Sequence, residues 1–445
     1  MARAPDVIVV GGGIAGLAAA CRIKDRGLTP LVIEAASRVG GRMTTDRVNG
    51  FAIDTGVTLL GNRFRGMRQL ARRVGLPLTP VGFSLAIRDR THERRYRAQN
   101  PFDLACDSQL SLAAKIAFAR IVGDVLAKRR GMLHGQSHLA LSADSESVDD
   151  YVGRLGVGGQ ELLAKVFEPG MRAALGGGLA QASRLVFEQI VWNTLGAGFW
   201  NFDGGVDRLP NGLANEVSVE LATEVLELRT STSGVEVDLR RGGTQETLSA
   251  RAAILAIPGN RIPAIFPGAP AWMLEPVCRT SFTGLSSAHV ALDRMPQSRR
   301  TGYGLMAGAD ELHDGVGVLE LEHLRAPGRC PPKKAMVSVY FVDSPTFQCL
   351  DADDVALRNK ATAVLERVFP DTAGTVEFVH IVRWPTAIAV FPKGRLREMA
   401  ALERRLACWD TPVDLAGDWL DGVASESAVQ TGLRAADRMA NRLRR

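Results

Sequence analysis

The feature that most constrains this chain is a glycine-rich turn that joins an apolar segment to a helix close to the N-terminus. Asp6–Val10 is apolar after its first residue and predicts a buried parallel strand. Gly11–Gly16 follows at once with the spacing G-x-G-x-x-G, and Leu17–Arg26 predicts a helix. Leu31–Glu34 predicts a second strand that ends on an acid. These segments form a βαβ unit of the kind that binds a dinucleotide at its first turn.

Each glycine of this spacing meets a different structural demand. Gly11 permits the tight turn, Gly13 lets the backbone approach a pyrophosphate, and Gly16 lets the helix pack closely on the strand. The helix N-terminus then offers amide N–H groups and positive partial charge to the phosphates. Glu34 can accept hydrogen bonds from ribose hydroxyls, and its charge would repel a 2′-phosphate, which disfavours NADP. Both FAD and NAD are compatible with this unit.

A second glycine-rich element follows the acid. Ser37–Arg42 holds a Gly-Gly pair that allows the backbone to lie close to a ligand, and Arg42 can pair with a phosphate. Asn49–Gly56 has the alternation of a strand and ends in a turn. A domain that binds only a nicotinamide cofactor does not need this Gly-Gly-Arg element, so its presence favours FAD.

These motifs, in this order, resemble the flavoprotein superfamily of amine oxidases, protoporphyrinogen oxidases and carotenoid desaturases. Near the other end of the chain, Val413–Leu420 contains Gly417-Asp418, and a helical pattern follows over Ser425–Ala436. This pair is similar to the family's closing motif, in which Gly-Asp meets the FAD ribityl and pyrophosphate groups. The resemblance covers nearly the whole chain and is closer to the protoporphyrinogen oxidase and desaturase branch.

The resemblance implies FAD as the cofactor and carries the family's FAD contacts onto positions of this chain. One of them is a backbone contact to adenine, made from the strand that contains Val225. We expect the following residues to bind FAD: Gly11, Gly13, Ile14, Ala15, Gly16, Glu34, Ala35, Gly40, Gly41, Arg42, Gly56, Val57, Thr58, Val225, Gly417, Asp418, Ser427 and Ala428.

The resemblance also implies an α/β fold, in which a Rossmann-like FAD-binding domain carries a discontinuous α+β substrate domain. We expect residues 1–85, 200–291 and 394–445 to form the FAD-binding domain, and residues 86–199 and 292–393 to form the substrate domain. Apolar residues at helical spacing over Leu110–Arg130 belong to the first substrate-domain segment. Two alternating segments, Glu224–Leu228 and Gly234–Leu239, predict a hairpin within the FAD-binding domain.

Two departures from the amine-oxidase branch bear on chemistry. Covalent amine oxidases attach FAD through a cysteine in a stretch that corresponds to Trp384–Gly394, which has no cysteine here, so we expect non-covalent FAD. Amine oxidases also enclose the substrate amine between two aromatic rings. The position of the second ring is Ala424 in this chain, and a single ring gives little amine recognition.

The third departure concerns His289, which stands where many amine oxidases keep a lysine that holds a water near flavin N5. If Val290 and Leu292 pack into the sheet's apolar layer, His289 points to the opposite face and into the flavin cavity. With an ordinary pKa near 6.5, a neutral imidazole there can accept a proton or hold a water. His289 is therefore the candidate catalytic residue, and a histidine that only fills space in the strand is the alternative.

Composition and charge restrict the other possibilities. The 445 residues carry 54 Lys and Arg against 48 Asp and Glu, a net charge of +6 that is spread along the chain, so we expect no nucleic acid partner. None of the six cysteines forms a CxxC pair, and no histidine lies at zinc spacing beside them, so no metal site is predicted. The N-terminal residues lack the pattern of a signal peptide, and no run of apolar residues is long enough for a transmembrane segment, so we expect a cytoplasmic protein.

The chain is thus expected to be an FAD-dependent oxidoreductase, either an oxidase or a desaturase. It would abstract hydride from a C–H bond of an apolar or polycyclic small-molecule substrate to flavin N5, with O2 or another compound as the electron acceptor. A flavin amine or amino-acid oxidase is the alternative, and a protein that binds FAD without turnover is a third reading. A paired aromatic cage or a carboxylate-binding arginine would favour the amine reading, whereas a lone ring and apolar walls would favour the first.

Overall fold

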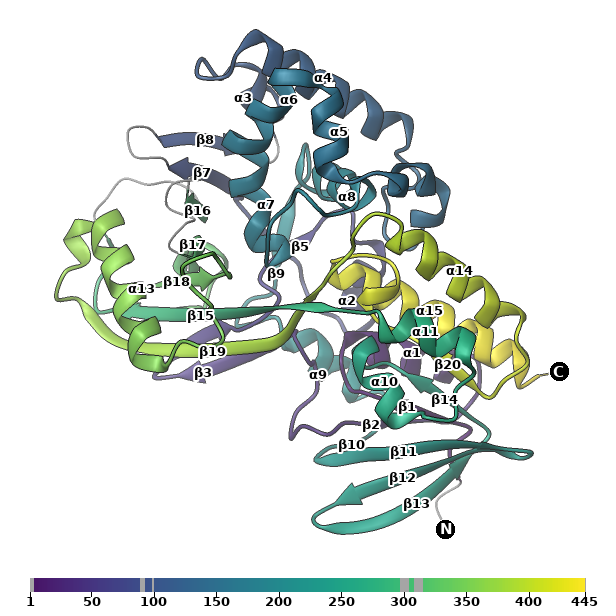
Figure 1. Ribbon diagram of the computed structural model, residues 1–445. Coiled ribbons are helices and arrows are strands. Elements are labelled where there is room, and N and C mark those ends of the chain that lie inside the picture. Colours follow the sequence, from purple (N-terminus) through teal and green to yellow (C-terminus); the bar gives the residue numbers. More distant parts are fainter. Residues whose placement is uncertain (1–3, 89–92, 98–99, 297–303, 308–314, 445) are drawn as a thin grey trace.

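The N-terminal βαβ unit is present in a computed structural model, which describes residues 4–88, 93–97, 100–296, 304–307 and 315–444 (Figure 1). Its two strands lie within a parallel sheet, in which each described strand pairs with its neighbour in parallel register. The strand order is β10-β2-β1-β14-β20, with bounds Ser218–Glu220, Pro30–Ile33, Val7–Val10, Ala252–Leu255 and Val413–Leu415. This is the expected Rossmann-like α/β layer, and its central strand β1 leads directly into the glycine-rich turn.

The two faces of this sheet are covered by different structures. Helices α1 (Ile14–Asp25) and α15 (Ser425–Arg442) lie side by side on one face, against Val7, Val9 and Ile254. A three-stranded antiparallel sheet covers the other face, and its strands β11, β12 and β13 span Thr223–Ser231, Gly234–Arg241 and Thr244–Ala250. The first two strands of that sheet are the predicted hairpin, so this expectation is confirmed.

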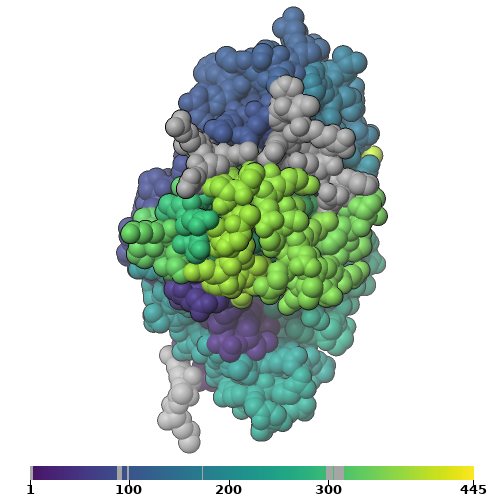
Figure 2. All heavy atoms as spheres, turned by 90° about the vertical axis from the view of Figure 1, so that its left-hand side faces the viewer, coloured from purple at the N-terminus to yellow at the C-terminus, as the bar shows by residue number. Residues whose placement is uncertain are grey.

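A second large sheet forms the other half of the molecule. Its described strands run in the order β19-β15-β18-β17-β16-β7-β8, with bounds Val376–Ala389, Phe282–Leu292, Ala335–Phe341, Val316–Leu321, Gly304–Ala307, Ser84–Arg88 and Glu93–Arg97. One face packs on α13 (Asp354–Val368) through Ala288, Val290 and Leu292. Figure 2 shows α13 and the neighbouring strands in light green across the middle of one side of the molecule.

The division into domains differs from the expectation at one strand. Residues 282–291 were assigned to the FAD-binding domain, but β15 pairs along its length with β18 and β19 of the seven-stranded sheet. The strand therefore belongs to the seven-stranded sheet, most of whose strands lie in the segments expected to form the substrate domain. The alternation of apolar residues in β15 is compatible with either of the two large sheets. Which sheet the strand joins depends on its pairing partners, which lie far away in the sequence.

A lobe of helices stands above the seven-stranded sheet (Figure 1). It contains α3, α4, α5, α6, α7 and α8, with bounds Phe102–Ala105, Leu112–Ala127, Val148–Arg154, Gly156–Leu162, Glu168–Leu175 and Arg184–Thr194. The predicted helical segment Leu110–Arg130 is confirmed as α4. Within the described ranges, no helix combines the length and the apolar character that a membrane crossing requires.

Shorter elements join these layers. The hairpin of β3 and β4 connects the glycine-rich region to the seven-stranded sheet, and a small sheet lies beneath the helical lobe. The remaining bounds are Thr45–Val48 (β3), Phe51–Asp54 (β4), Leu60–Gly61 (β5), Thr79–Val81 (β6), Phe199–Asn201 (β9), Arg65–Arg73 (α2), Arg208–Ala214 (α9), Ile262–Ile265 (α10), Ala271–Cys278 (α11) and Arg395–Cys408 (α14).

Candidate active site

A cavity of about 880 Å³ runs from the glycine-rich turn into the space between the seven-stranded sheet and the helical lobe. Its walls therefore come from both halves of the fold and from segments that are far apart in the sequence. Most of the residues expected to bind FAD line it: Gly11, Gly13, Ile14, Ala15, Glu34, Gly40, Gly41, Arg42, Gly56, Val57, Thr58, Gly417, Asp418 and Ala428.

Four expected FAD residues do not line the cavity. Gly16 lies inside α1, where it lets the helix approach the preceding turn, and Ala35 follows Glu34 on the exposed side. Val225 is buried in β11 next to an irregularity in the pairing with β12. The hydroxyl of Ser427 faces away from the cavity, 3.0 Å from Nδ1 of His134. The FAD contacts expected at these four residues therefore stay predictions, among them the backbone contact at Val225.

The glycine-rich turn has the shape that a dinucleotide needs. A Cβ atom on Gly16 would lie 2.0 Å from the Gly11 carbonyl oxygen, and one on Gly11, whose φ is +105°, would lie 2.6 Å from the Ala256 oxygen. These two positions therefore accept only glycine. A Cβ on Gly13 would meet no protein atom within 4 Å, because Gly13 faces the open cavity at the start of α1. The helix N–H groups are thus free to meet a phosphate, which fits FAD.

Glu34 lies at the end of β2 with its carboxylate held by the backbone. Its Oε2 accepts a hydrogen bond from the Gly12 N–H at 2.6 Å, and its Oε1 accepts one from the Ala36 N–H at 2.8 Å. These bonds fix the carboxylate at the cavity wall, beside the turn. Each oxygen keeps a further lone pair, so the side chain can still accept from ribose hydroxyls as expected.

Arg42 lines the cavity as expected and is also hydrogen-bonded within the chain. Its Nη2 donates to Oδ1 of Asp418 at 2.8 Å, and its Nη1 donates to the carbonyl oxygen of Ala387 at 2.5 Å. The guanidinium therefore joins the Gly-Gly-Arg element to the closing motif and to β19, and it keeps further N–H donors for a phosphate. Asp418 and Arg42 both line the cavity, so the ion pair forms part of the wall against which a flavin would lie.

The other half of the cavity is mostly apolar. All seven strands of the seven-stranded sheet contribute lining residues. Those of β7 and β17 alternate along the strand, because successive side chains point to opposite faces. The helical lobe covers this half from above. The apolar lining of this half consists of Phe83, Leu85, Ile87, Leu104, Val166, Phe167, Met171, Ile190, Val191, Leu195, Phe199, Leu285 and Val318.

Trp384 and Ala424 both line the cavity, and Ala424 is the position that the resemblance gives to the second ring of an amine cage. The indole Nε1 of Trp384 donates to the carbonyl oxygen of Thr55 at 2.6 Å, which fixes the ring beside the turn at Gly56. Ala424 is the N-cap of α15 and offers no ring. The cavity therefore has one aromatic wall at this place.

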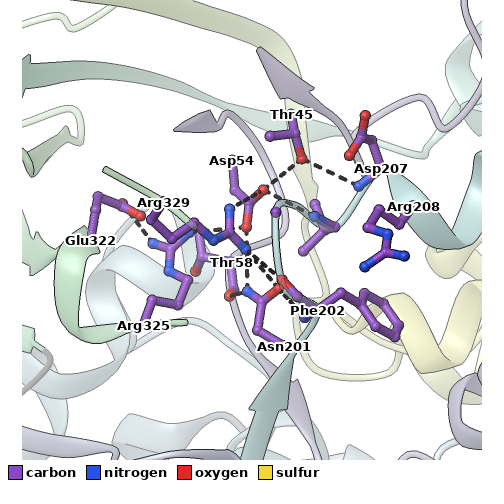
Figure 3. A network of polar contacts seen from close by, with 12 residues as sticks. Thr45, Asp54, Thr58, Asn201, Phe202, Asp207, Arg208, Glu322, Arg325 and Arg329 are labelled. Atoms are coloured by element: carbon purple, nitrogen blue, oxygen red, sulfur yellow. Dashed lines mark hydrogen bonds and ion pairs between the residues drawn. The ribbon is translucent and has the colours of Figure 1, made fainter. Parts of the chain in front are cut away.

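A buried polar network lies behind the sheet's contribution to the cavity (Figure 3). Arg325, which is fully buried, donates to Asp54 at 3.2 Å and to Glu320 and Glu322 at 2.6 Å each. Arg329 forms a second ion pair with Asp54 at 2.7 Å. Burial opposes the charge of Asp54, but Arg329 and Arg325 outweigh it and hold the pKa of this carboxyl below its ordinary value. The network thus ties β4 to the seven-stranded sheet beside the flavin-side turn.

His289 does not line the cavity, which corrects the expectation that its imidazole looks into it. The side chain is fully buried, with Nδ1 2.7 Å from the Ser338 hydroxyl and Nε2 3.0 Å from the Ser287 hydroxyl. The alternation argument identified the right face, since Leu285 on that face does line the cavity. His289 lies further along β15, beyond the end of the cavity.

The surroundings of His289 also change its acid–base behaviour. Burial, with help from nearby His380 and Arg325, lowers the pKa of His289 to about 3. The imidazole is therefore neutral at physiological pH and does not cycle between its two forms there. An ordinary pKa does not apply to an imidazole that is fully buried.

Sequence reasoning missed Glu320, an acidic side chain in the apolar half of the cavity. Its Oε1 lies 3.5 Å from the Thr58 hydroxyl, close to the turn that the resemblance places beside the flavin. The sequence contains a signal that could have identified Glu320, because it is the one charged residue in the otherwise apolar strand β17. A charge in a strand that is buried along its length indicates a polar partner or a ligand.

Comparisons with known proteins agree with this geometry. The model of the family described as flavin containing amine oxidoreductase matches residues 14–440. A candidate flavin-containing monoamine oxidase from Mycobacterium tuberculosis is 39% identical over 119 residues, which are 26% of this chain and 24% of that protein. A flavin-containing amine oxidase from Danio rerio is 36% identical over 102 residues, 23% of this chain and 20% of that protein. The chain thus aligns with only about a quarter of these curated relatives' length.

Solved structures match along the whole chain. Cyclohexylamine oxidase from Brevibacterium oxydans IH-35A has a TM-score of 0.76 at 21% identity, and the match covers 100% of both chains. A candidate protoporphyrinogen oxidase from Exiguobacterium sp. 255-15 has a TM-score of 0.73 at 18% identity, with 99% of both chains covered. At these identities the likeness establishes the fold: an α/β FAD-binding domain with an α+β second domain.

Proposed function

Because this chain belongs to the family of flavin containing amine oxidoreductases, which are FAD-dependent enzymes, we propose that its cavity holds non-covalent FAD beside an apolar or polycyclic organic substrate. The absence of a covalent bond is supported by the cavity wall, since none of the described lining residues is a cysteine. The reaction is removal of a hydride from a C–H bond of that substrate.

The residues at the two ends of the cavity have separate tasks. Gly13 and the N-terminus of α1 would receive the pyrophosphate, Glu34 the ribose, and the Arg42–Asp418 pair would support the flavin end. FAD supplies the hydride acceptor at N5 when it is bound. Trp384 and the apolar residues of the sheet and the helical lobe would hold the substrate's reacting carbon close by and exclude water.

The reaction balances without a protein base. A substrate that gave a hydride to bound FAD and a proton to solvent would be oxidised by two electrons. O2 or another acceptor would take these two electrons from the reduced FAD. No histidine of the described chain lines the cavity, and His289 is neutral and enclosed, so we assign no side chain as the proton acceptor.

One observation carries the choice of an apolar substrate: the walls beyond Trp384 are mostly aliphatic and aromatic side chains from several elements. Burying apolar substrate surface against them is favourable by about 25 cal/mol for each Å² removed from water. A small charged substrate gains nothing from such walls and must leave its hydration shell to enter them.

Glu320 favours a second candidate, oxidation of an amine. Its carboxylate lies in the apolar half of the cavity, so a substrate ammonium group there would meet a negative charge. The similarity in fold to cyclohexylamine oxidase is compatible with this candidate. The missing second ring at Ala424 counts against it.

The two candidates are separated by anaerobic bleaching of the bound flavin with a panel of amines, porphyrinogens, polyenes and cyclic precursors. We expect an apolar or polycyclic compound to bleach the flavin, with the rate in a Glu320→Gln variant within about threefold of the wild type. Bleaching by amines alone, with KM at least tenfold higher in Glu320→Gln, would replace the first candidate by the second.

A further inference from the structure

The solvent face of α4 is apolar along its whole length. Leu112, Ile116, Ala119, Gly123 and Leu126 are all exposed and follow one another at spacings of four and three residues, so they lie on one side of the helix. The exposed fractions of Leu112, Ile116 and Leu126 are 74%, 49% and 48%. A helix on the surface of a globular domain normally turns its apolar stripe toward the core, and α4 has apolar residues on both sides.

Two neighbouring elements extend this apolar stripe. Helix α6 packs against the start of α4 so closely that a Cβ on Gly158 would lie 2.2 Å from the Ala113 oxygen. The adjacent Val157 is 82% exposed, and Phe102 on α3, which contacts α4, is 69% exposed. We call Leu112, Ile116, Ala119, Gly123 and Leu126, together with Phe102 and Val157, the docking face. It lies at the top of the helical lobe in Figure 1.

Cations flank the docking face. Lys115, Arg120, Arg129 and Arg130 belong to α4 or the turn that follows it, and none of them forms an ion pair with another described residue. The acid of this helix, Asp124, is occupied, because its carboxylate accepts from the Tyr151 hydroxyl and from Arg184, both at 2.8 Å. The solvent side of α4 therefore presents apolar side chains with uncompensated positive charge beside them.

The docking face adjoins an opening of the cavity. Leu104 of α3 lines the cavity, two residues from the exposed Phe102. Arg97 and Asn100, immediately before α3, also line it, and the side chain of Arg97 is 64% exposed. The apolar half of the cavity thus reaches the surface next to the docking face.

We propose that the docking face binds the surface of a lipid bilayer that contains anionic lipids, with α4 lying in the plane of the interface. Apolar side chains on one side of a helix enter the boundary of the acyl chains, and flanking lysine and arginine residues meet the anionic headgroups. The net charge of +6 adds a long-range attraction to the same surface. A substrate dissolved in the bilayer would then reach the cavity through the opening beside α3 without crossing water.

Flotation of the holoenzyme with lipid vesicles tests this proposal, with flavin absorbance as the measure of bound, folded protein. The vesicles consist of phosphatidylcholine alone or of phosphatidylcholine mixed with phosphatidylglycerol. We expect the wild type to float with the mixed vesicles and much less with phosphatidylcholine alone, and high salt to reverse the binding. No substrate is present, so the outcome is independent of the proposed function.

Matched variants locate the contact. Leu112→Glu/Ile116→Glu is expected to lower the partition coefficient on mixed vesicles at least tenfold, whereas Val355→Glu/Met295→Glu, at exposed positions outside the lobe, should leave it unchanged. Arg120→Gln/Arg129→Gln/Arg130→Gln should lower it by roughly 100-fold, since each cation near an anionic surface contributes about fivefold. The control Arg72→Gln/Arg358→Gln/Arg404→Gln removes the same charge at other exposed positions.

Three results would overturn the proposal. The first is wild-type protein that stays with the lipid-free fraction on both kinds of vesicle. The second is an equal loss of binding in the docking-face and control variants, which would mean non-specific attraction. The third is a dimer in sedimentation experiments that Leu112→Glu/Ile116→Glu converts to a monomer while lipid binding is absent. That result would assign the docking face to a second copy of this chain.

Discussion

Gly13 and Gly16 lie three residues apart in the same turn, yet their surroundings predict opposite consequences of substitution. Gly13→Ala adds a methyl group to open space at an ordinary φ of −70°, so the apoprotein should keep its thermal stability. The same methyl group would occupy the approach of a pyrophosphate, and we expect FAD affinity to fall at least tenfold.

Gly16→Ala would place its Cβ 2.0 Å from the Gly11 oxygen and should lower stability before any cofactor is added. Thermal melts of the apoproteins and FAD titrations separate the two effects. Unchanged FAD affinity in Gly13→Ala would mean that the pyrophosphate lies elsewhere.

Replacement of His289 is expected to lower the stability of the protein without slowing flavin reduction. His289→Ala would remove a fully buried ring and its hydrogen bonds with the hydroxyls of Ser287 and Ser338, at a cost of about 2–4 kcal/mol, although Ser338 would still donate to Glu322. The imidazole is neutral and outside the cavity, so flavin reduction by the substrate should change less than about threefold. Chemical denaturation and stopped-flow reduction measure the two quantities. A rate that falls by about 10²-fold with stability intact would restore a catalytic role for His289.

At the scale of elements, the network around Arg325 joins β4, β17 and the segment after it, and it predicts a pH dependence of stability. Burial, reinforced by Glu320 and opposed by Arg325, raises the pKa of Glu322 to about 7 from an ordinary 4.5. Its Oε2 is buried without a hydrogen-bond partner, which is where a proton would sit. The stabilisation from this proton is fully present below about pH 4.5 and is lost as the pH rises through about 7.

The glutamine side chain in Glu322→Gln cannot ionise, so this variant should not lose stability as the pH rises through about 7. We expect the free energy of unfolding of the variant, relative to the wild type, to become more favourable between about pH 5 and about pH 8. Urea denaturation at both pH values measures it, with Glu224→Gln at an exposed position of β11 as the control. A difference between variant and wild type that stays constant with pH would show that Glu322 is ionised throughout this range.

The elements also explain how much of the site the sequence could predict. The β1–α1 turn, Glu34 and the Gly417-Asp418 turn were predictable because each rests on local backbone geometry within a few residues. The apolar half was not, because Leu285, Val318 and Leu85 reach one wall only through pairing between strands far apart in the chain. His289 shows a limit of prediction from sequence: alternation along a strand gives the face to which a side chain points, but not whether it reaches the cavity. Arg42 shows another, since its partners Asp418 and Ala387 come from distant segments.

At the scale of the whole molecule, the walls of the cavity come from both halves of the fold. Heat or acid that unfolds the protein should therefore release intact FAD into the supernatant, since no described cysteine lines the cavity. Fluorescence of the supernatant and of the precipitate measures the distribution of flavin. Flavin that remains with the precipitated chain after washing would show a covalent attachment through another residue.

The central claim is that one cavity holds FAD beside an apolar substrate whose C–H bond yields a hydride. Anaerobic single-turnover reduction of the bound flavin tests it most directly, with an apolar or polycyclic substrate from the panel and its analogue deuterated at the reacting carbon. We predict complete bleaching of the flavin, a slower rate with the deuterated substrate and little change of either rate in Glu320→Gln. Flavin that stays oxidised with every apolar compound, while amines reduce it, would contradict the claim.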